Sequence, residues 1–425
     1  MFRKRSIPLA AAFGLMILCL TVVSTAMGAS TEKVPYNFCR VQLCPDGANP
    51  WASLISDAAG NLYGTTLYGG NSNCSHGCGV VFELTRANGK WEQKVLRHFE
   101  NDGKDGYYPF AGLIFDNAGN LYGTTQEGGV DGAGTVFEVM PEKDGKWKEK
   151  ILHSFLSTGD GVYPDAALVF GADGKLYGTT YQGGAYGYGT VFRLKPGANG
   201  HWSEKVLHNF DFNGKDGTGP LAGLIFDRSG NLYGTTQTGG STNNGTVFEM
   251  TPAKNGSWGE KVLYNFTGGL DGGLPNAGLV FDVTGNLYST TVAAGYPHCY
   301  RGGGCGTVFQ LTPAARGKWT LATLFSFEGT DGAFPYSGLI FDAAGNLYGT
   351  TNDGGAYSAC NLGCGSVFKL APGHWSESLL HSFDDNGMDG FAPYSGLIMD
   401  ATGNLYGTTY DGGANGYGTV FEVVP

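Results

Sequence analysis

Hydrophobic residues along this chain come in short runs separated by glycine-rich polar turns, and the same order of runs recurs seven times. In the second repeat, the apolar run 111–116 is followed by a turn at 117–120, the segments 121–125 and 134–139, and finally the segment 147–155. Short runs bounded by Gly and Asn predict strands. Each repeat therefore predicts four antiparallel strands joined by hairpins, which is one blade of a β-propeller.

The phrase Gly-Asn-Leu-Tyr-Gly-Thr-Thr marks each repeat with few changes. Its tyrosines are spaced 55 to 60 residues apart: Tyr63, Tyr122, Tyr177, Tyr233, Tyr288, Tyr348 and Tyr406. A period of this length is typical of propellers and solenoids, in which neighbouring units share a continuous core. We therefore expect one all-β domain, residues 29–425, folded as a seven-bladed β-propeller of four-stranded antiparallel blades.

The two ends of the repeat region complement each other. The last repeat stops at 418–423, its third strand, whereas residues 32–38 match the fourth-strand segment 260–266 at six of seven positions. We predict that the N-terminal strand, about residues 32–38, pairs with 418–423 and completes the last blade, which removes an exposed sheet edge. Pro35 suits an outermost strand because it donates no ladder hydrogen bond. The alternative, a superhelical solenoid, leaves the N-terminal segment without a partner.

Two further positions recur in the fourth-strand segment. Six tryptophans open it, and we interpret them as packing between blades: Trp91, Trp147, Trp202, Trp258, Trp319 and Trp375. A position near its end holds seven residues of four types: Tyr36, Arg97, His153, His208, Tyr264, Phe325 and His381. Because this position accepts such different side chains, we interpret its histidines as packing residues.

Charge and the first residues narrow the possible environments. The chain has 26 basic and 37 acidic side chains, a net charge of −11, which disfavours nucleic acid and anionic membranes as partners. Residues 1–28 combine a basic start, an apolar run and small residues near 26–28, which predicts a cleaved signal peptide. A retained anchor helix is the alternative, and no later segment is long enough to span a bilayer. We expect a secreted or periplasmic monomer.

Eight cysteines follow the predicted signal peptide in four close pairs: Cys39 and Cys44, Cys74 and Cys78, Cys299 and Cys305, Cys360 and Cys364. An even number in an exported chain favours disulfides within each loop. A metal site is the alternative, because His76 lies between Cys74 and Cys78.

The motif G-L-I-F-D-x-x-G-N-L-Y-G-T-T, followed by a Gly-Gly loop and G-T-V-F-E-L, resembles that of the choice-of-anchor GloVer tandem-repeat proteins. The resemblance extends over about residues 30–425. It implies an exported bacterial protein, and it supplies no catalytic residues because the family has no assigned activity. The chain departs from the anchored members by ending at Pro425 directly after a strand, so we expect a form that is not attached through its C-terminus. The D-x-x-G-N-x-Y hairpin is also similar to that of NHL-type propellers, a likeness of turns alone.

Asp-Gly-x-x-Pro precedes the first strand of every repeat. If that strand is innermost, the seven aspartates surround one mouth of the central channel and could bind calcium, which prefers several oxygen ligands. These candidate metal ligands are Asp46, Asp105, Asp160, Asp216, Asp271, Asp331 and Asp389. The alternative is that each aspartate accepts backbone N–H groups and fixes its own turn. Calcium is the only cofactor that the sequence suggests.

The loop between the second and third strands varies most among the repeats, and we expect it to open at the same mouth. Its tyrosine, amide and carboxyl side chains favour a polar, neutral ligand such as a glycan. The candidate ligand-binding residues are Tyr68, Gln126, Tyr181, Gln182, Gln237, Asn352, Asp353, Tyr410 and Asp411. The alternative is that they are solvated turn residues without a ligand.

The sequence contains no G-x-S-x-G elbow, H-E-x-x-H motif, phosphate-binding loop or nucleotide fingerprint, so no catalytic residue is predicted. We expect a non-catalytic binding module for an extracellular glycan or an envelope protein. Two alternatives are a calcium-dependent propeller enzyme that acts on glycans or lactones as a hydrolase or lyase, and a purely structural envelope protein.

Overall fold

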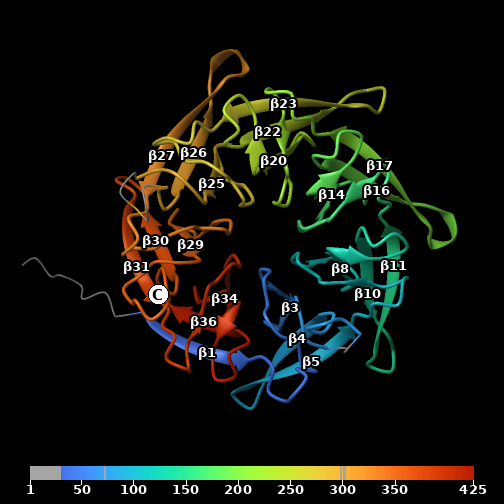
Figure 1. The fold of residues 1–425 in the computed structure, drawn as a ribbon, viewed down its shortest axis with the longest axis vertical. Coiled ribbons are helices and arrows are strands. Elements are labelled where there is room, and N and C mark those ends of the chain that lie inside the picture. Colours follow the sequence, from blue (N-terminus) through green and yellow to red (C-terminus); the bar gives the residue numbers. More distant parts are fainter. Residues whose placement is uncertain (1–29, 71–72, 297–298, 300–302) are drawn as a thin grey trace, which may run out of the picture.

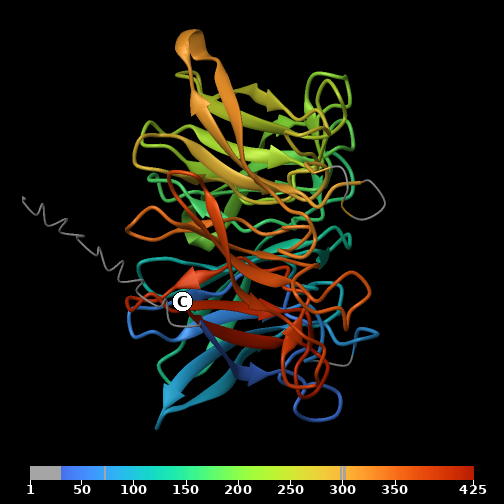
Figure 2. The ribbon, with the colours of Figure 1, turned by 90° about the vertical axis from the view of Figure 1, so that its left-hand side faces the viewer.

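The computed structural model describes residues 30–425 apart from 71–72, 297–298 and 300–302. Seven four-stranded antiparallel sheets stand around a central axis (Figure 1), and Figure 2 shows the same assembly from its side. The described residues form no α-helix, and two short 3-10 turns, η1 (Ala198–Gly200) and η3 (Ala315–Gly317), connect third to fourth strands. The predicted all-β, seven-bladed propeller is confirmed. The predicted signal peptide, residues 1–28, lies outside the described residues.

Blades are numbered here in chain order, and their strands run from the channel outwards. The strands are β2 (Ile55–Ser56), β3 (Leu62–Thr66), β4 (Val80–Ala87) and β5 (Lys90–His98) in blade 1; β7 (Ile114–Phe115), β8 (Leu121–Thr125), β10 (Thr135–Pro141) and β11 (Trp147–Ser154) in blade 2; β13 (Val169–Phe170), β14 (Leu176–Thr180), β16 (Thr190–Pro196) and β17 (Trp202–Asn209) in blade 3; β19 (Ile225–Phe226), β20 (Leu232–Thr236), β22 (Thr246–Pro252) and β23 (Trp258–Asn265) in blade 4; β24 (Val280–Phe281), β25 (Leu287–Thr291), β26 (Thr307–Pro313) and β27 (Trp319–Ser326) in blade 5; β28 (Ile340–Phe341), β29 (Leu347–Thr351), β30 (Ser366–Ala371) and β31 (Ser376–Ser382) in blade 6; and β33 (Ile398–Met399), β34 (Leu405–Thr409), β36 (Thr419–Val424) and β1 (Thr31–Asn37) in blade 7.

Four short ladders lie outside the blades. They pair β6 (Gly106–Tyr107) with β9 (Glu127–Gly128), β12 (Gly161–Val162) with β15 (Gln182–Gly183), β18 (Gly217–Thr218) with β21 (Thr238–Gly239), and β32 (Gly390–Phe391) with β35 (Asp411–Gly412).

The innermost strand is shorter than the sequence predicts. Of the apolar run 111–116, only β7 forms a ladder, where Ile114 pairs with Tyr122. The carbonyl of Ala111 instead accepts a hydrogen bond from Thr65 Oγ1 of blade 1 at 3.2 Å. The equivalent bond links every blade to the next and includes Thr408 to Ala52 across the ring closure, which explains why the first threonine of the phrase recurs.

The hydrophobic core lies between blades. Tyr122, Leu152 and Phe155 of blade 2 form one buried cluster with residues of blade 3. Within it, the rings of Phe155 and Phe192 meet edge to face with centroids 5.1 Å apart, a favoured aromatic geometry. The ring of Trp202 in blade 3 packs against that of Tyr122 in blade 2, with centroids 6.5 Å apart. This contact confirms the predicted packing role of the recurring tryptophan.

Ring closure follows the sequence prediction. The N-terminal strand β1 pairs antiparallel with β36, with Glu32 opposite Val423 and Asn37 opposite Thr419. The register shifts between Lys33 and Tyr36, around Pro35, and the outer ladders of the other six blades shift at the equivalent position, so proline is tolerated there. In Figure 1, β1 lies at the rim of blade 7, beside the C-terminal strands.

All four predicted disulfides form: Cys39–Cys44, Cys74–Cys78, Cys299–Cys305 and Cys360–Cys364. The thiols of these loops are therefore not free to bind a metal. Within the described part of the chain, no helix has the length and apolar character required to cross a bilayer.

Candidate functional site

The Asp-Gly-x-x-Pro segment carries the chain from the rim of one blade to the channel. In blade 2, Gly106 passes so close to Thr125 that a Cβ atom would overlap its hydroxyl group, so only glycine fits. The segment then pairs with the loop between the second and third strands, through Gly106 with Gly128 and Tyr107 with Glu127. The Asp-Gly-x-x-Pro segment and this loop therefore lie at the same end of the propeller.

The residue after this proline lies at the channel mouth in every blade. The seven positions surround one cavity of about 360 Å³ and are occupied, from blade 1 to blade 7, by Trp51, Phe110, Asp165, Leu221, Asn276, Tyr336 and Tyr394. The short backbone segments that precede the innermost strands, such as 111–113, form much of the remaining wall. We call these seven residues the mouth ring.

Four consecutive positions of the mouth ring are aromatic. Trp51 stacks on Tyr394 with ring centroids 3.7 Å apart and planes tilted by 13°. The ring centroid of Phe110 lies 4.6 Å from that of Trp51, and the ring centroid of Tyr336 lies 5.2 Å from that of Tyr394. Tyr410, from the variable loop of blade 7, meets Trp51 edge to face at 5.4 Å. These contacts form a continuous apolar surface, the aromatic arc, across blades 6, 7, 1 and 2.

The opposite side of the mouth ring carries two polar residues, Asp165 and Asn276, on either side of Leu221. Gln126 Nε2 donates a hydrogen bond to Asp165 Oδ1 at 3.1 Å, and the Tyr181 hydroxyl donates to Gln237 Oε1 at 3.2 Å. The buried Oδ1 atom of Asn276 has no hydrogen-bond partner among the described residues. Buried polar groups are usually paired, so this oxygen is free to accept a bond from a ligand.

Asp165 is the most unusual titratable group of the mouth. Its side chain is 8% exposed, and burial raises the pKa of its carboxyl group to about 7. The hydrogen bond from Gln126 opposes this rise, and the charge of Glu127 adds to it. Near neutral pH the group can therefore be protonated and donate a hydrogen bond, or be ionised and accept two.

The nine candidate ligand-binding residues fall into two groups, according to whether they are first or second in the pair that precedes the glycines of the loop. The first residue of each pair faces the mouth: Gln126, Tyr181, Gln237, Asn352 and Tyr410 contact the mouth ring or one another. The second residue pairs through its backbone with the Asp-Gly-x-x-Pro segment: Tyr68, Gln182, Asp353 and Asp411. Tyr68 lies in another cavity, of about 740 Å³, between the two disulfide loops of residues 39–44 and 74–78.

The structure does not bring the seven candidate calcium ligands together. Each carboxylate lies against the outer strand that precedes it in the chain, at the rim of the propeller. Six accept a hydrogen bond from a side chain of that strand: Asp46, Asp105, Asp160, Asp216, Asp271 and Asp389. Asp331 accepts a backbone hydrogen bond from Glu328 N, because Phe325 occupies the donor position. The aspartates therefore fix turns, which was the alternative interpretation.

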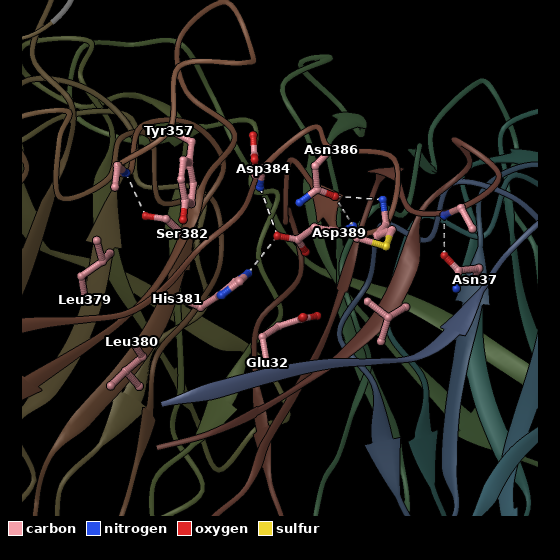
Figure 3. Close-up of a pocket in the computed structure, with 14 residues that line it drawn as sticks. Glu32, Asn37, Tyr357, Leu379, Leu380, His381, Ser382, Asp384, Asn386 and Asp389 are labelled. Atoms are coloured by element: carbon pink, nitrogen blue, oxygen red, sulfur yellow. Dashed lines mark hydrogen bonds and ion pairs between the residues drawn. The ribbon is translucent and has the colours of Figure 1, made fainter. Parts of the chain in front are cut away.

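The same contacts correct our interpretation of the histidines as packing residues. Nε2 of His153, His208 and His381 lies 2.9 to 3.0 Å from the recurring aspartate of the same connection. Tyrosine and arginine donate to the aspartate from the equivalent position, so the varied side chains share one role as hydrogen-bond donors. Figure 3 shows this arrangement for His381 and Asp389, with Glu32 of β1 beside them.

Sequence reasoning missed the mouth ring. The available signal was the residue after the recurring proline, which changes from tryptophan to aspartate to leucine while its neighbours stay nearly constant. In a closed repeat structure, a variable position inside a constant segment indicates a surface that differs from blade to blade.

Comparisons with known proteins agree with the fold. The periplasmic gluconolactonase PpgL of Pseudomonas aeruginosa is 15% identical, with a TM-score of 0.52 over 85% of this chain and 99% of that one. A fungal alcohol oxidase of the AA5 family, solved in complex with copper, is 13% identical, with a TM-score of 0.55 over 93% of this chain and 75% of that one. At these identities the likeness concerns the fold alone. No curated protein sequence matches the chain.

The model of the Gloeobacter/Verrucomicrobia repeat matches residues 21–158, 73–301 and 285–425. These matches overlap and reach the last residue, so they include every blade. They confirm the resemblance drawn from the repeat motif. The chain belongs to the Gloeobacter/Verrucomicrobia repeat family.

Proposed function

We propose that this protein is an exported, non-catalytic propeller that binds a glycan at its channel mouth. The observation that carries the proposal is the arrangement of the mouth ring, in which an aromatic arc faces buried polar groups across one cavity. Sugars have apolar C–H faces and polar hydroxyl edges. The arc can stack against such a face, while Asp165 and Asn276 receive the hydroxyl groups.

The shape and charge of the mouth favour a particular class of sugar. A cavity of about 360 Å³ is at the small end of ligand pockets, which suits one end of a glycan more than a long stretch of polymer. The net charge of −11 and the carboxyl group of Asp165 disfavour acidic sugars, so neutral or amino sugars are the proposed ligands. An envelope protein is a weaker candidate, because stable protein interfaces bury about 800 Å² per partner on flatter surfaces.

The proposed location is the periplasm or the outside of the cell. Four disulfides support an oxidising compartment, because such bonds persist mainly in exported proteins. The predicted signal peptide is the second argument. Amino-terminal sequencing of the mature protein from the cell envelope and medium tests both points.

A neutral-glycan array followed by calorimetric titration tests the proposed function. Trp51→Ala or Tyr394→Ala removes half of the central stack, and each is expected to weaken binding about 10- to 100-fold, or roughly 1.4 to 2.7 kcal/mol. Tyr186→Ala is the matched control, because Tyr186 is 58% exposed and lies outside the cavity. Absence of glycan binding, or equal binding by the Trp51→Ala variant, refutes the proposal.

A carboxyl-dependent hydrolase is the second candidate. It is favoured by one observation, the pKa of about 7 at Asp165, since a general acid or base works best near the operating pH. Incubation with sugar lactones and glycosides tests it. Turnover that Asp165→Asn abolishes while glycan affinity stays within a few-fold supports catalysis. Binding without turnover supports the non-catalytic function.

A further inference from the structure

A group of three side chains recurs between neighbouring blades, at the rim of the propeller. Its first member is the residue near the end of one outer strand, at the position of Tyr36 or Arg97, and its second is the aspartate of the Asp-Gly-x-x-Pro segment that follows. Its third member belongs to the next outer strand and lies two residues after the recurring tryptophan position. We call it the interblade triad. The seven triads are Tyr36–Asp46–Gln93, Arg97–Asp105–Glu149, His153–Asp160–Glu204, His208–Asp216–Glu260, Tyr264–Asp271–Leu321, Phe325–Asp331–Glu377 and His381–Asp389–Glu32.

The third residue of the triad varies with the type of donor. All four triads with a basic donor contain a glutamate, whereas both triads with a tyrosine contain an uncharged residue, Gln93 or Leu321, in its place. Only the triad of Phe325 has a glutamate without a basic donor. In six of the seven triads, a second carboxylate is thus present only where the donor is a basic residue.

The arginine triad shows where the cation belongs. Arg97 Nη2 lies 2.5 Å from Asp105 Oδ2, and Arg97 Nε lies 2.7 Å from Glu149 Oε2. One guanidinium group thus contacts both carboxylates. Two buried carboxylates on adjacent blades are held around a single positive charge.

Histidine cannot contact both carboxylates in this way. His381 Nε2 lies 3.0 Å from Asp389 Oδ2, while Glu32 Oε1 and Asp389 Oδ1 are buried without any hydrogen-bond partner among the described residues. The triad His208–Asp216–Glu260 repeats this arrangement: His208 is bonded to Asp216, and the buried Oε1 of Glu260 is unpaired among the described residues. Asp216 and Asp389 are each 8% exposed. These oxygens need a positive partner that the imidazole does not supply.

In both triads, one nitrogen and two carboxylate oxygens lie within 4.8 Å of one another. Figure 3 shows Glu32 directed towards the His381–Asp389 pair at the edge of an open cavity of about 660 Å³.

We propose that the triads His208–Asp216–Glu260 and Glu32–His381–Asp389 each bind one divalent transition-metal ion of the zinc class. Two positive charges neutralise both carboxylates, whereas a protonated imidazole supplies one. One imidazole nitrogen with two carboxylate oxygens is a donor set of zinc and its neighbours, not of calcium, which prefers oxygen alone. In the second of these triads the ion joins β1 to blade 6, so it holds the N-terminal strand that closes the ring.

Zinc binding to the full chain tests the proposal. The protein is stripped with EDTA, and zinc is counted by equilibrium dialysis at micromolar free metal. The expected count is two ions per chain, one after His208→Phe or His381→Phe, and none in the double variant. Phenylalanine is the residue that blade 5 itself carries at this position, so the substitutions are compatible with the blade. His201→Tyr is the matched control, because His201 is exposed and outside the triads.

A second readout is the thermal midpoint. Zinc is expected to raise it in the wild-type chain and in the His201→Tyr variant, and to leave the double variant unchanged. A wild-type chain that binds no zinc, or a zinc count that the double variant keeps, overturns the proposal. So does a thermal midpoint of the wild-type chain that zinc leaves unchanged.

Discussion

The substitution Asp165→Asn tests the electrostatic character of the channel mouth. The unfolded chain has an ordinary carboxyl group at this position, with a pKa near 3.8, whereas the folded chain raises that pKa to about 7. The folded state therefore keeps a proton that the unfolded state releases between about pH 4 and pH 7. Because the folded state binds more protons in this window, stability falls as the pH rises through it and is level above it.

The size of the effect follows from the shift. Each pKa unit corresponds to 1.36 kcal/mol, so a shift of about three units makes the ionised Asp165 destabilising by roughly 4 kcal/mol at pH 8 relative to pH 4. Asparagine does not titrate and retains an Oδ1 atom to accept the bond from Gln126. The free energy of unfolding of the Asp165→Asn variant, relative to that of the wild-type chain, is therefore expected to rise by about this amount from pH 4 to pH 8.

Guanidinium unfolding of both chains at several pH values between 4 and 8 measures this difference. Other buried carboxyl groups, among them Glu204 and Glu260, titrate in the same window, but they are common to both chains and cancel. Asp116→Asn is the control, because hydrogen bonds in its turn lower the pKa of Asp116 below its ordinary value near 3.8, so its contribution to stability is lost only below that pH and the difference from the wild-type chain is expected to stay constant between pH 4 and pH 8. A difference between the Asp165→Asn and wild-type chains that stays constant with pH refutes the argument.

Three further outcomes are expected. Arg97→Met leaves two buried carboxylates without their cation and is expected to cost about 3 kcal/mol in denaturant unfolding, whereas Arg97→Tyr with Glu149→Gln, which copies the first triad, restores most of that loss. Removal of residues 30–38 exposes the edge of β36, so light scattering is expected to show association, and the matching peptide added in trans is expected to reverse it. Gly123→Ala places a Cβ atom 2.5 Å from the Phe137 ring and is expected to lower stability by about 1 to 3 kcal/mol, measured by denaturant unfolding; an unchanged midpoint contradicts this packing.

The architecture could be predicted because local and global signals agree. The recurring phrase defines the blade, and the segment 32–38 supplies the strand that the last repeat lacks. The seven inter-blade bonds from threonine were not predicted, although the threonines were visible, because a hydroxyl group gives no sign of which carbonyl it meets. Similarly, Tyr36, Arg97 and His153 show no shared chemistry in the sequence. The structure places each of them beside the equivalent aspartate of its own repeat.

The candidate site could not be predicted for a different reason. Its members are about one repeat apart in sequence and meet only because the ring closes. Reasoning from one repeat directs attention to the residues that are constant, such as the aspartates, and these prove to fix turns at the rim. The residues that differ among repeats, such as Trp51 and Asp165, occupy the one place where seven equivalent positions converge.

Position within the ring gives the aromatic arc a further consequence. Its central stack joins Trp51, on the first blade, to Tyr394, on the last blade, and so crosses the seam at which β1 closes the propeller. Because β1 precedes blade 1 in the chain, an opening in which β1 leaves β36 and moves away with blade 1 would disrupt the stack and the ladder together. A ligand that lies across the arc binds the closed ring and not the open one, so by mass action it must favour closure. Under the proposed function, recognition at the mouth and closure of the ring are therefore linked, because the contacts proposed to hold the ligand also stabilise the closed ring.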